Sequence, residues 1–117
     1  ISIYNFHGIP GFEKKDTRER EIQTDRLLEV LSRDTSPKIA VGDFNLNPDT
    51  EAIGRMENIL LNLVKERGVA TTRSSFYKRK DELPFADYCF VSPELKVNDF
   101  QVLPDEVSDH LPLLLVF

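Results

Sequence analysis

The stretch Lys38-Ile39-Ala40-Val41-Gly42-Asp43-Phe44-Asn45 joins a short apolar run to a glycine, a carboxylate and an amide. Residues 39–41 are apolar without alternation, which indicates a strand that is buried on both faces. The glycine permits a sharp turn after this strand, and Asp43 and Asn45 are expected to point to the same side. The stretch therefore predicts a strand over residues 38–41 that leads into polar groups at the rim of a sheet.

The segments on either side predict an alternation of helices and strands. Asp16-Thr17-Arg18-Glu19 is typical of a helix start, because a capping acid at Asp16 is followed three positions later by Glu19. This helix should run for about four turns and end before Pro37. A second helical region opens after Asn47-Pro48-Asp49 and stops at Gly68. Further strands are expected at residues 1–6, 85–92, 96–103 and 111–117.

The order strand, helix, strand, helix and then three strands predicts an α/β domain with a mixed sheet flanked by helices. The chain has 117 residues, of which 40% are hydrophobic, and this is enough for one core. We therefore expect one domain, or part of one, over residues 1–117. Layered α/β domains support many chemistries, so the function must come from the motifs.

The composition excludes some classes of function. A formal net charge of −5 argues against binding to polyanions by bulk electrostatics, although it suits carboxylates gathered around a divalent cation. Cys89 is the single cysteine, so no internal disulfide can form, and the histidines are too far apart for zinc-ligand spacing. No apolar stretch approaches ~18 residues, so we expect no membrane span. The compartment stays open, with the cytoplasm favoured.

A second polar motif, Ser108-Asp109-His110, stands before the last strand. Adjacent side chains on an extended segment point to opposite faces, so Asp109 and His110 should have separate partners. Asp109 suits a metal ion, and Asp87, in Ala86-Asp87-Tyr88, is the candidate to orient the ring of His110. In the alternative reading, Asp109 caps a turn and His110 is a structural imidazole.

Three other features each have two readings. Residues 42–45 could instead form an Asx turn that leads into the next helix. His7 ends the first strand, and by itself it is more often structural than catalytic. Residues 71–80 form a basic stretch with two aromatic side chains, so they could contact a nucleic-acid backbone, with Arg73 as a candidate substrate-binding residue. The alternative is a solvated loop.

Taken together and in this order, four motifs resemble those of the endonuclease/exonuclease/phosphatase family, whose members are similar to deoxyribonuclease I and AP endonucleases. The motifs are Asn5-Phe6-His7, Gly42-Asp43-Phe44-Asn45, Ala86-Asp87-Tyr88 and Ser108-Asp109-His110. The resemblance implies a four-layer α/β/β/α sandwich. It also implies metal-dependent cleavage of phosphate esters, usually with Mg²⁺ and with Mn²⁺ as an alternative.

The resemblance also implies roles for single residues. Asp43 would orient or deprotonate the attacking water, and Asn45 would bind the scissile phosphate or help to position that water. His110, oriented by Asp87, would stabilise the charge on the transition state, and Asp109 would take part in metal binding. A family histidine that contacts the phosphate or the leaving group matches His7. These residue types fit the chemistry, because water is a poor nucleophile and a phosphodiester is anionic.

One departure from the family pattern concerns its first half, which supplies an early asparagine and a metal-binding glutamate. Nothing before His7 can match them, so we interpret the chain as the C-terminal half of a family domain. A nuclease acting on nucleic acid is the leading hypothesis. The alternatives are a non-catalytic binding module and, among enzymes, a sphingomyelinase-like or inositol-phosphate phosphatase activity. The sheet face formed by residues 38–43 and 111–117 should then be exposed and favour self-association.

Overall fold

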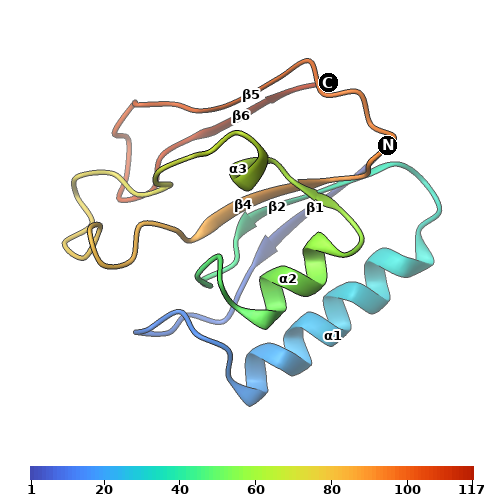
Figure 1. Ribbon diagram of the computed structural model, residues 1–117, viewed down its shortest axis with the longest axis horizontal. Helices are drawn as coiled ribbons and strands as arrows, with labels where there is room; N and C mark the ends of the chain where they lie inside the picture. Colours follow the sequence, from blue (N-terminus) through green and yellow to red (C-terminus); the bar gives the residue numbers. More distant parts are fainter.

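Strands and helices follow the expected order except in the second helical region, and the strands form two sheets. The computed structural model describes residues 1–117. In chain order the elements are β1 (Ser2–His7), α1 (Arg18–Arg33), β2 (Lys38–Asp43), α2 (Glu51–Glu57), β3 (Leu61–Asn62), α3 (Leu63–Glu66), β4 (Asp87–Val91), β5 (Asp99–Val102) and β6 (Leu113–Val116) (Figure 1). The main sheet has the order β1-β2-β4-β3, and β5 pairs with β6 in a second sheet.

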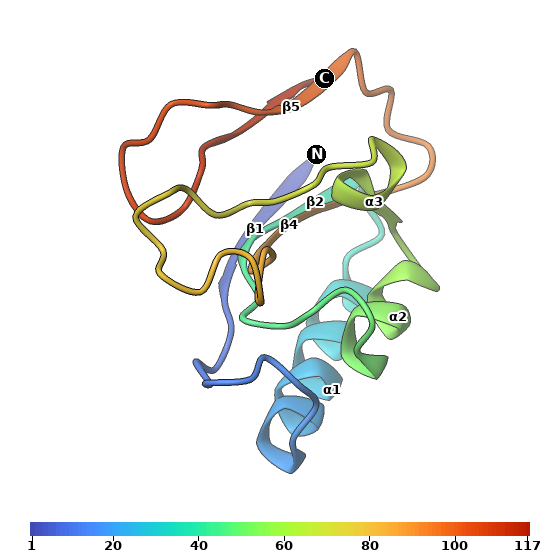
Figure 2. The ribbon, with the colours of Figure 1, turned by 60° about the vertical axis from the view of Figure 1, so that its left-hand side comes forward.

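The main sheet is mixed, as predicted. Strands β1 and β2 are parallel, whereas β4 runs antiparallel to both β2 and β3. Figure 2 shows α1 and α2 on one side of this sheet and the β5–β6 ribbon on the other. The α/β class is therefore confirmed. None of the helices is both long enough and apolar enough to cross a lipid bilayer.

The main core lies between the sheet and the helices. Alternate residues of β4, Tyr88 and Phe90, are fully buried, and they belong to one cluster with Leu31 of α1 and Ile53 and Met56 of α2. Burying a side chain of this size contributes about 1.5–3 kcal/mol. Strand β4 is buried along its whole length because the ribbon covers its other face.

The expectation that residues 111–117 share one sheet with residues 38–43 is wrong. Strand β6 pairs with β5 in a register that sets Phe100 opposite Leu115, so both apolar side chains lie on one face of the ribbon. Phe100 is 4% exposed and belongs to the core cluster, against which Leu115 packs. The ribbon thus covers part of the face that was expected to be open, and Ile3 of β1 remains 62% exposed beside it.

The first helix begins one residue later than its motif indicates. Thr17 is the N-cap of α1, and its hydroxyl accepts a hydrogen bond from the backbone N–H of Arg20. The Asp16 carboxylate instead accepts from the backbone N–H groups of Glu51 (2.8 Å) and Ala52 (3.1 Å) at the start of α2. Asp16 therefore joins the starts of two helices that lie far apart in the sequence.

The second helical region is not continuous. Helix α2 ends at Glu57, and Leu61 and Asn62 then pair with Val91 and Phe90 at the edge of the main sheet. The Asn62 side chain caps the short helix α3 by accepting from the backbone N–H of Lys65. Apolar periodicity alone cannot detect this interruption, because the edge strand is stabilised by β4, a segment remote in sequence.

Candidate active site

Sheet register brings three of the candidate residues into one row. His7 of β1 is paired with Asp43 of β2, and Asp43 is paired with Asp87 of β4. Side chains of directly paired residues lie on the same face of a sheet. Three neighbouring strands therefore each place one polar group at the same edge. These groups lie on the face of Ile3, Val41 and Cys89, which line one pocket with Phe100 and Leu115 of the β5–β6 ribbon.

Gly42 makes this register possible. Its φ is +142°, and a Cβ at this position would lie 2.0 Å from the carbonyl oxygen of Phe6. A side chain here would therefore push β1 away from β2. After Asp43 the chain is anchored by Phe44, whose ring centroid lies 4.9 Å from that of Phe6 and 5.7 Å from that of Tyr88. Such aromatic pairs contribute about 0.5–1.5 kcal/mol each beyond area burial.

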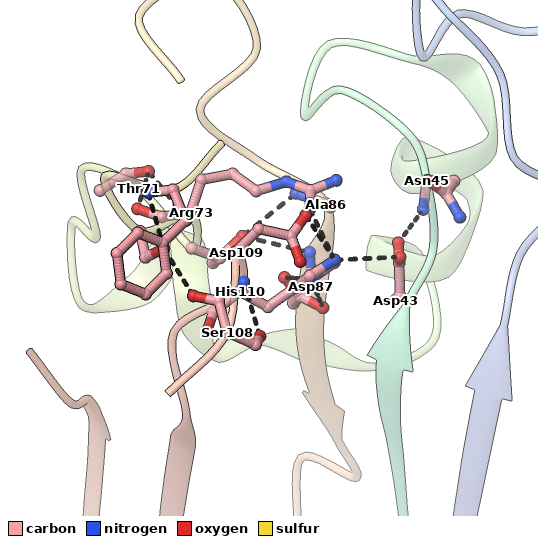
Figure 3. A network of polar contacts seen from close by, with 12 residues as sticks. Asp43, Asn45, Thr71, Arg73, Ala86, Asp87, Ser108, Asp109 and His110 are labelled. Atoms are coloured by element: carbon pink, nitrogen blue, oxygen red, sulfur yellow. Dashed lines mark hydrogen bonds and ion pairs between the residues drawn. The ribbon is translucent and has the colours of Figure 1, made fainter. Parts of the chain in front are cut away.

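His110 reaches this row from the segment that precedes β6. Its Nδ1 lies 2.9 Å and 2.8 Å from the two carboxylate oxygens of Asp87, so the predicted hydrogen bond is present (Figure 3). Its Nε2 lies 3.7 Å from Oδ2 of Asp43. His7 is farther out, with Nε2 4.0 Å from the same oxygen and a side chain that is 77% exposed. The site thus lies where the two sheets meet at one edge.

The contacts of His110 determine its tautomer. Nη1 of Arg73 lies 2.5 Å from Nε2 of His110. Because arginine can only donate, Nε2 is the acceptor in this arrangement. The proton therefore sits on Nδ1 and is donated to Asp87. The hydrogen bond with Asp87 raises the pKa of His110, although burial and the nearby Arg73 oppose this shift.

Arg73 is buried against this cluster. Its side chain is 5% exposed and lies 3.1 Å from Oδ2 of the half-exposed Asp109, while its guanidinium stacks 4.2 Å from the ring centroid of Tyr77. The expectation that Asp109 and His110 point to opposite faces is wrong, since both reach the same nitrogen of Arg73. The segment is a turn rather than a strand, because the backbone N–H of His110 donates to the hydroxyl of Ser108.

A segment that the sequence analysis treated only as a basic stretch connects the parts of the site. The hydroxyl of Thr72 accepts from the backbone N–H groups of Ala86 (3.1 Å) and Asp87 (3.2 Å), and its carbonyl accepts from Leu111. Arg73 forms an isolated β-bridge with His110. The hydroxyl-rich composition of residues 71–75 was the one feature of the sequence that pointed to these hydrogen bonds. Neither Arg73 nor Tyr77 is a freely solvated side chain.

Asn45 is placed differently from the prediction. Its φ is +54° and it lies two residues beyond the end of β2, so the alternation of an extended strand does not apply to it. Its backbone N–H donates to Asp43 Oδ1 at 2.8 Å, which is the Asx turn of the alternative reading. Its side-chain amide is buried between the carbonyl of Gly8 and the ammonium of Lys14. The sequence analysis did not single out Lys14.

The donor groups of the site fit a divalent cation. Asp43, Asp87 and His110 each offer a ligand atom, and these atoms lie within 4.8 Å of one another. Carboxylate oxygens are the preferred ligands of hard cations such as Mg²⁺. Both oxygens of Asp87 lie against His110, so the less engaged carboxylates are those of Asp43 and Asp109.

One edge of the sheet thus holds two carboxylates, a histidine oriented by one of them and a buried arginine. Groups of these types can activate a water molecule and stabilise negative charge. The chain belongs to the Endonuclease/Exonuclease/phosphatase family, which matches residues 9–110. Members of this family are generally hydrolytic enzymes of the phosphoesterase type and typically depend on a divalent metal. The predicted family is therefore confirmed.

One solved structure with a similar fold is described as a functionally unknown conserved protein from Enterococcus faecalis V583. The TM-score is 0.66 and the identity is 20%, with 95% of this chain and 47% of that chain covered. This chain therefore spans about half the length of the structure it matches. The likeness concerns the fold alone. No curated protein matches the sequence.

Proposed function

We propose that the protein to which this chain belongs is a Mg²⁺-dependent phosphodiesterase, and specifically a nuclease. The observation that carries this proposal is the Asp87–His110 hydrogen bond, which holds the imidazole beside Asp43 at the edge of the sheet. A carboxylate that can activate water and a ring that can carry positive charge thus lie within one site. Residues 1–117 provide these groups as the C-terminal half of the domain.

In the proposed reaction Asp43 orients the attacking water and accepts its proton. The water oxygen forms a bond to phosphorus, and the bond from phosphorus to the leaving oxygen breaks. In this step His110 is doubly protonated and its Nε2 turns from Arg73 to the substrate: Nε2–H donates to an oxygen of the phosphate as negative charge develops there, while Nδ1–H donates to Asp87. Asp109 and Asp43 would hold a Mg²⁺ ion, which would supply neutralisation of phosphate charge and would support activation of the water.

Three further residues contact the substrate in this proposal. His7 lies at the exposed rim, where it meets the phosphate or the leaving group. The amide nitrogen of Asn45 donates one N–H to Gly8, and its second N–H would contact the phosphate, while Arg73 supplies a positive charge behind His110. Nucleic acid is the preferred substrate class because Phe76 is 63% exposed and Lys78, two positions later in the same loop, is also exposed. An exposed aromatic ring and an exposed cation in one loop suit a base and its phosphate.

The proposal is tested with a protein that contains residues 1–117 together with the upstream half. Plasmid DNA, RNA, sphingomyelin and an inositol polyphosphate are supplied in parallel, each with Mg²⁺ and with EDTA. We expect metal-dependent cleavage of a nucleic acid. Cleavage of only the lipid or the inositol phosphate would contradict the nuclease assignment. No hydrolysis of any of the four would contradict the enzyme assignment and favour the binding module.

A further inference from the structure

Two residues other than glycine have a positive φ, and their side chains are bonded to each other. Lys14 has a φ of 52° and Asn45 a φ of 54°. The ammonium of Lys14 donates to Oδ1 of Asn45 at 2.8 Å, and this contact is buried. Left-handed backbone is tolerated by asparagine but disfavoured for lysine, so surrounding contacts are needed above all to hold Lys14.

These contacts are present around Lys14. The guanidinium of Arg20, on α1, donates to the carbonyls of Ile9 and Lys15 and so fixes both ends of the loop that carries Lys14. The carbonyl of Lys14 itself accepts from the backbone N–H of Asn47 at 2.8 Å. The side chain enters the protein interior, and the residue is only 3% exposed. A flexible surface lysine would show none of these features.

The bond from Lys14 determines which way the Asn45 amide faces. An ammonium can only donate and a backbone carbonyl can only accept. The oxygen of the Asn45 amide must therefore face Lys14, and its nitrogen must face the carbonyl of Gly8, 3.1 Å away. An amide nitrogen carries two hydrogens, so one N–H remains for another acceptor.

We propose that Lys14 is a positioning residue, which holds Asn45 with an amide N–H rather than the amide oxygen directed at the substrate phosphate. This inference rests on the proposed function, since it names the device that orients one phosphate-binding group. With a neutral, non-donating side chain at position 14, the amide oxygen would lose its hydrogen bond and only the 3.1 Å bond to Gly8 would hold the amide. The amide would then rotate more readily and present its oxygen more often. An amide oxygen would repel an anionic phosphate oxygen, because neither can donate a hydrogen bond.

Charge supports the same assignment. Burial lowers the pKa of Lys14, and Arg73 adds to this shift, while Asp43 and Asp87 oppose it. The ammonium is therefore within electrostatic reach of the two carboxylates that flank His110. It adds a buried positive charge on the side of the site where Asn45 is held.

The test compares Lys14→Met with Lys15→Met in the 117-residue chain. Lys15 is the neighbouring residue, but its side chain is 69% exposed and pairs with Glu13 on the surface. Hydrogen exchange of the Asn45 side-chain amide is followed by ¹⁵N NMR, and inorganic phosphate serves as the binding probe. We expect Lys14→Met to speed this exchange and to weaken phosphate binding, each by about tenfold, since bonds to charged groups are worth this much. Lys15→Met should change neither.

A second variant separates the amide orientation from the stability of the loop. Lys14→Gln keeps an N–H donor without the charge, so it should restore most of the protection and most of the phosphate affinity. Unchanged exchange in folded Lys14→Met would overturn the proposal. Folded Lys14→Gln would also overturn the proposal if its Asn45 amide exchanged as fast as in Lys14→Met. The same holds if it bound phosphate no better than Lys14→Met. These signals need no turnover, so a failure to hydrolyse phosphodiesters would count against the proposed function alone.

Discussion

His110 Nδ1 lies 2.8 Å from Oδ2 of Asp87, and this bond connects the segment before β6 to the first residue of β4. It spans 23 positions of sequence and links the β5–β6 part of the molecule to the main sheet. With one ring nitrogen held in this way, the other is directed toward Asp43 (Figure 3). The same bond therefore contributes to the fold and to the geometry of the site.

The first prediction concerns the pKa of His110. The bond to Asp87 raises this pKa in the folded protein above the unfolded value of about 6.5, so protonation favours folding. The stabilisation is fully present below the unfolded pKa and is lost as the pH rises through the folded pKa. Asp87→Asn should lower the midpoint of the His110 ring signals in an NMR titration of the metal-free chain. An unchanged midpoint would contradict this linkage, and Asp25→Asn on α1 is the control.

The second prediction concerns turnover in a protein that includes the upstream half. His110→Ala and Asp43→Ala should each lower phosphodiester cleavage by at least ~100-fold, the usual value of acid–base and charge-stabilising groups. Folding should change little, because both residues lie at a polar rim. Asp25→Ala, with its 60% exposed carboxylate on α1, should keep full activity. Near-normal turnover of either site variant at saturating Mg²⁺ would rule out the assigned role.

The third prediction distinguishes the two residues at the first helix start. Thr17→Ala should expose the backbone N–H of Arg20 in α1, whereas Asp16→Ala should expose those of Glu51 and Ala52 in α2. Each change should cost about 1 kcal/mol of unfolding free energy. Amide hydrogen exchange separates the two effects. Faster exchange in α1 rather than α2 after Asp16→Ala would contradict the observed cap.

The fourth prediction concerns the part of the sheet face that the ribbon leaves open. Ile1 and Ile3 of the β1 region are 63% and 62% exposed, and Phe117 is 49% exposed. Such a patch favours association, so the isolated chain should self-associate at micromolar concentration. Sedimentation should show Ile3→Lys shifting the chain toward monomer. Ile59→Lys, at an exposed position after α2, should have no such effect. A stable wild-type monomer would refute the prediction.

The fifth prediction concerns metal affinity. Within residues 1–117, Asp43 and Asp109 are the less engaged carboxylates of the site, and Asp109 already pairs with Arg73. Such a set leaves Mg²⁺ with few protein ligands, so binding should be weak. Calorimetric titration of the isolated chain with Mg²⁺ tests this expectation. Tight binding would show that these residues form a complete metal site without an upstream glutamate.

Much of the site could be predicted because its residues stand beside recognisable strands. Apolar residues before Asp43 and after His110 marked the strands, and the need of a histidine for a carboxylate partner identified Asp87. The positions of Thr72 and Lys14 could not be predicted in this way. Thr72 acts through backbone groups of a segment 14 and 15 positions away, and Lys14 acts through a side chain 31 positions away.

Local patterns of the sequence by themselves determined the order of the elements other than β3 and α3, the α/β class and the identity of the polar groups that follow the strands. These properties depend on neighbouring residues, through apolar periodicity and turn propensity. Tertiary structure decided that β5 and β6 form a separate sheet, that the Asp16 carboxylate accepts from the first backbone N–H groups of α2 and that Asn45 faces Lys14. Each of these depends on which distant groups cover an apolar surface or accept a hydrogen bond from an unpaired donor. Only the folded chain brings those groups together.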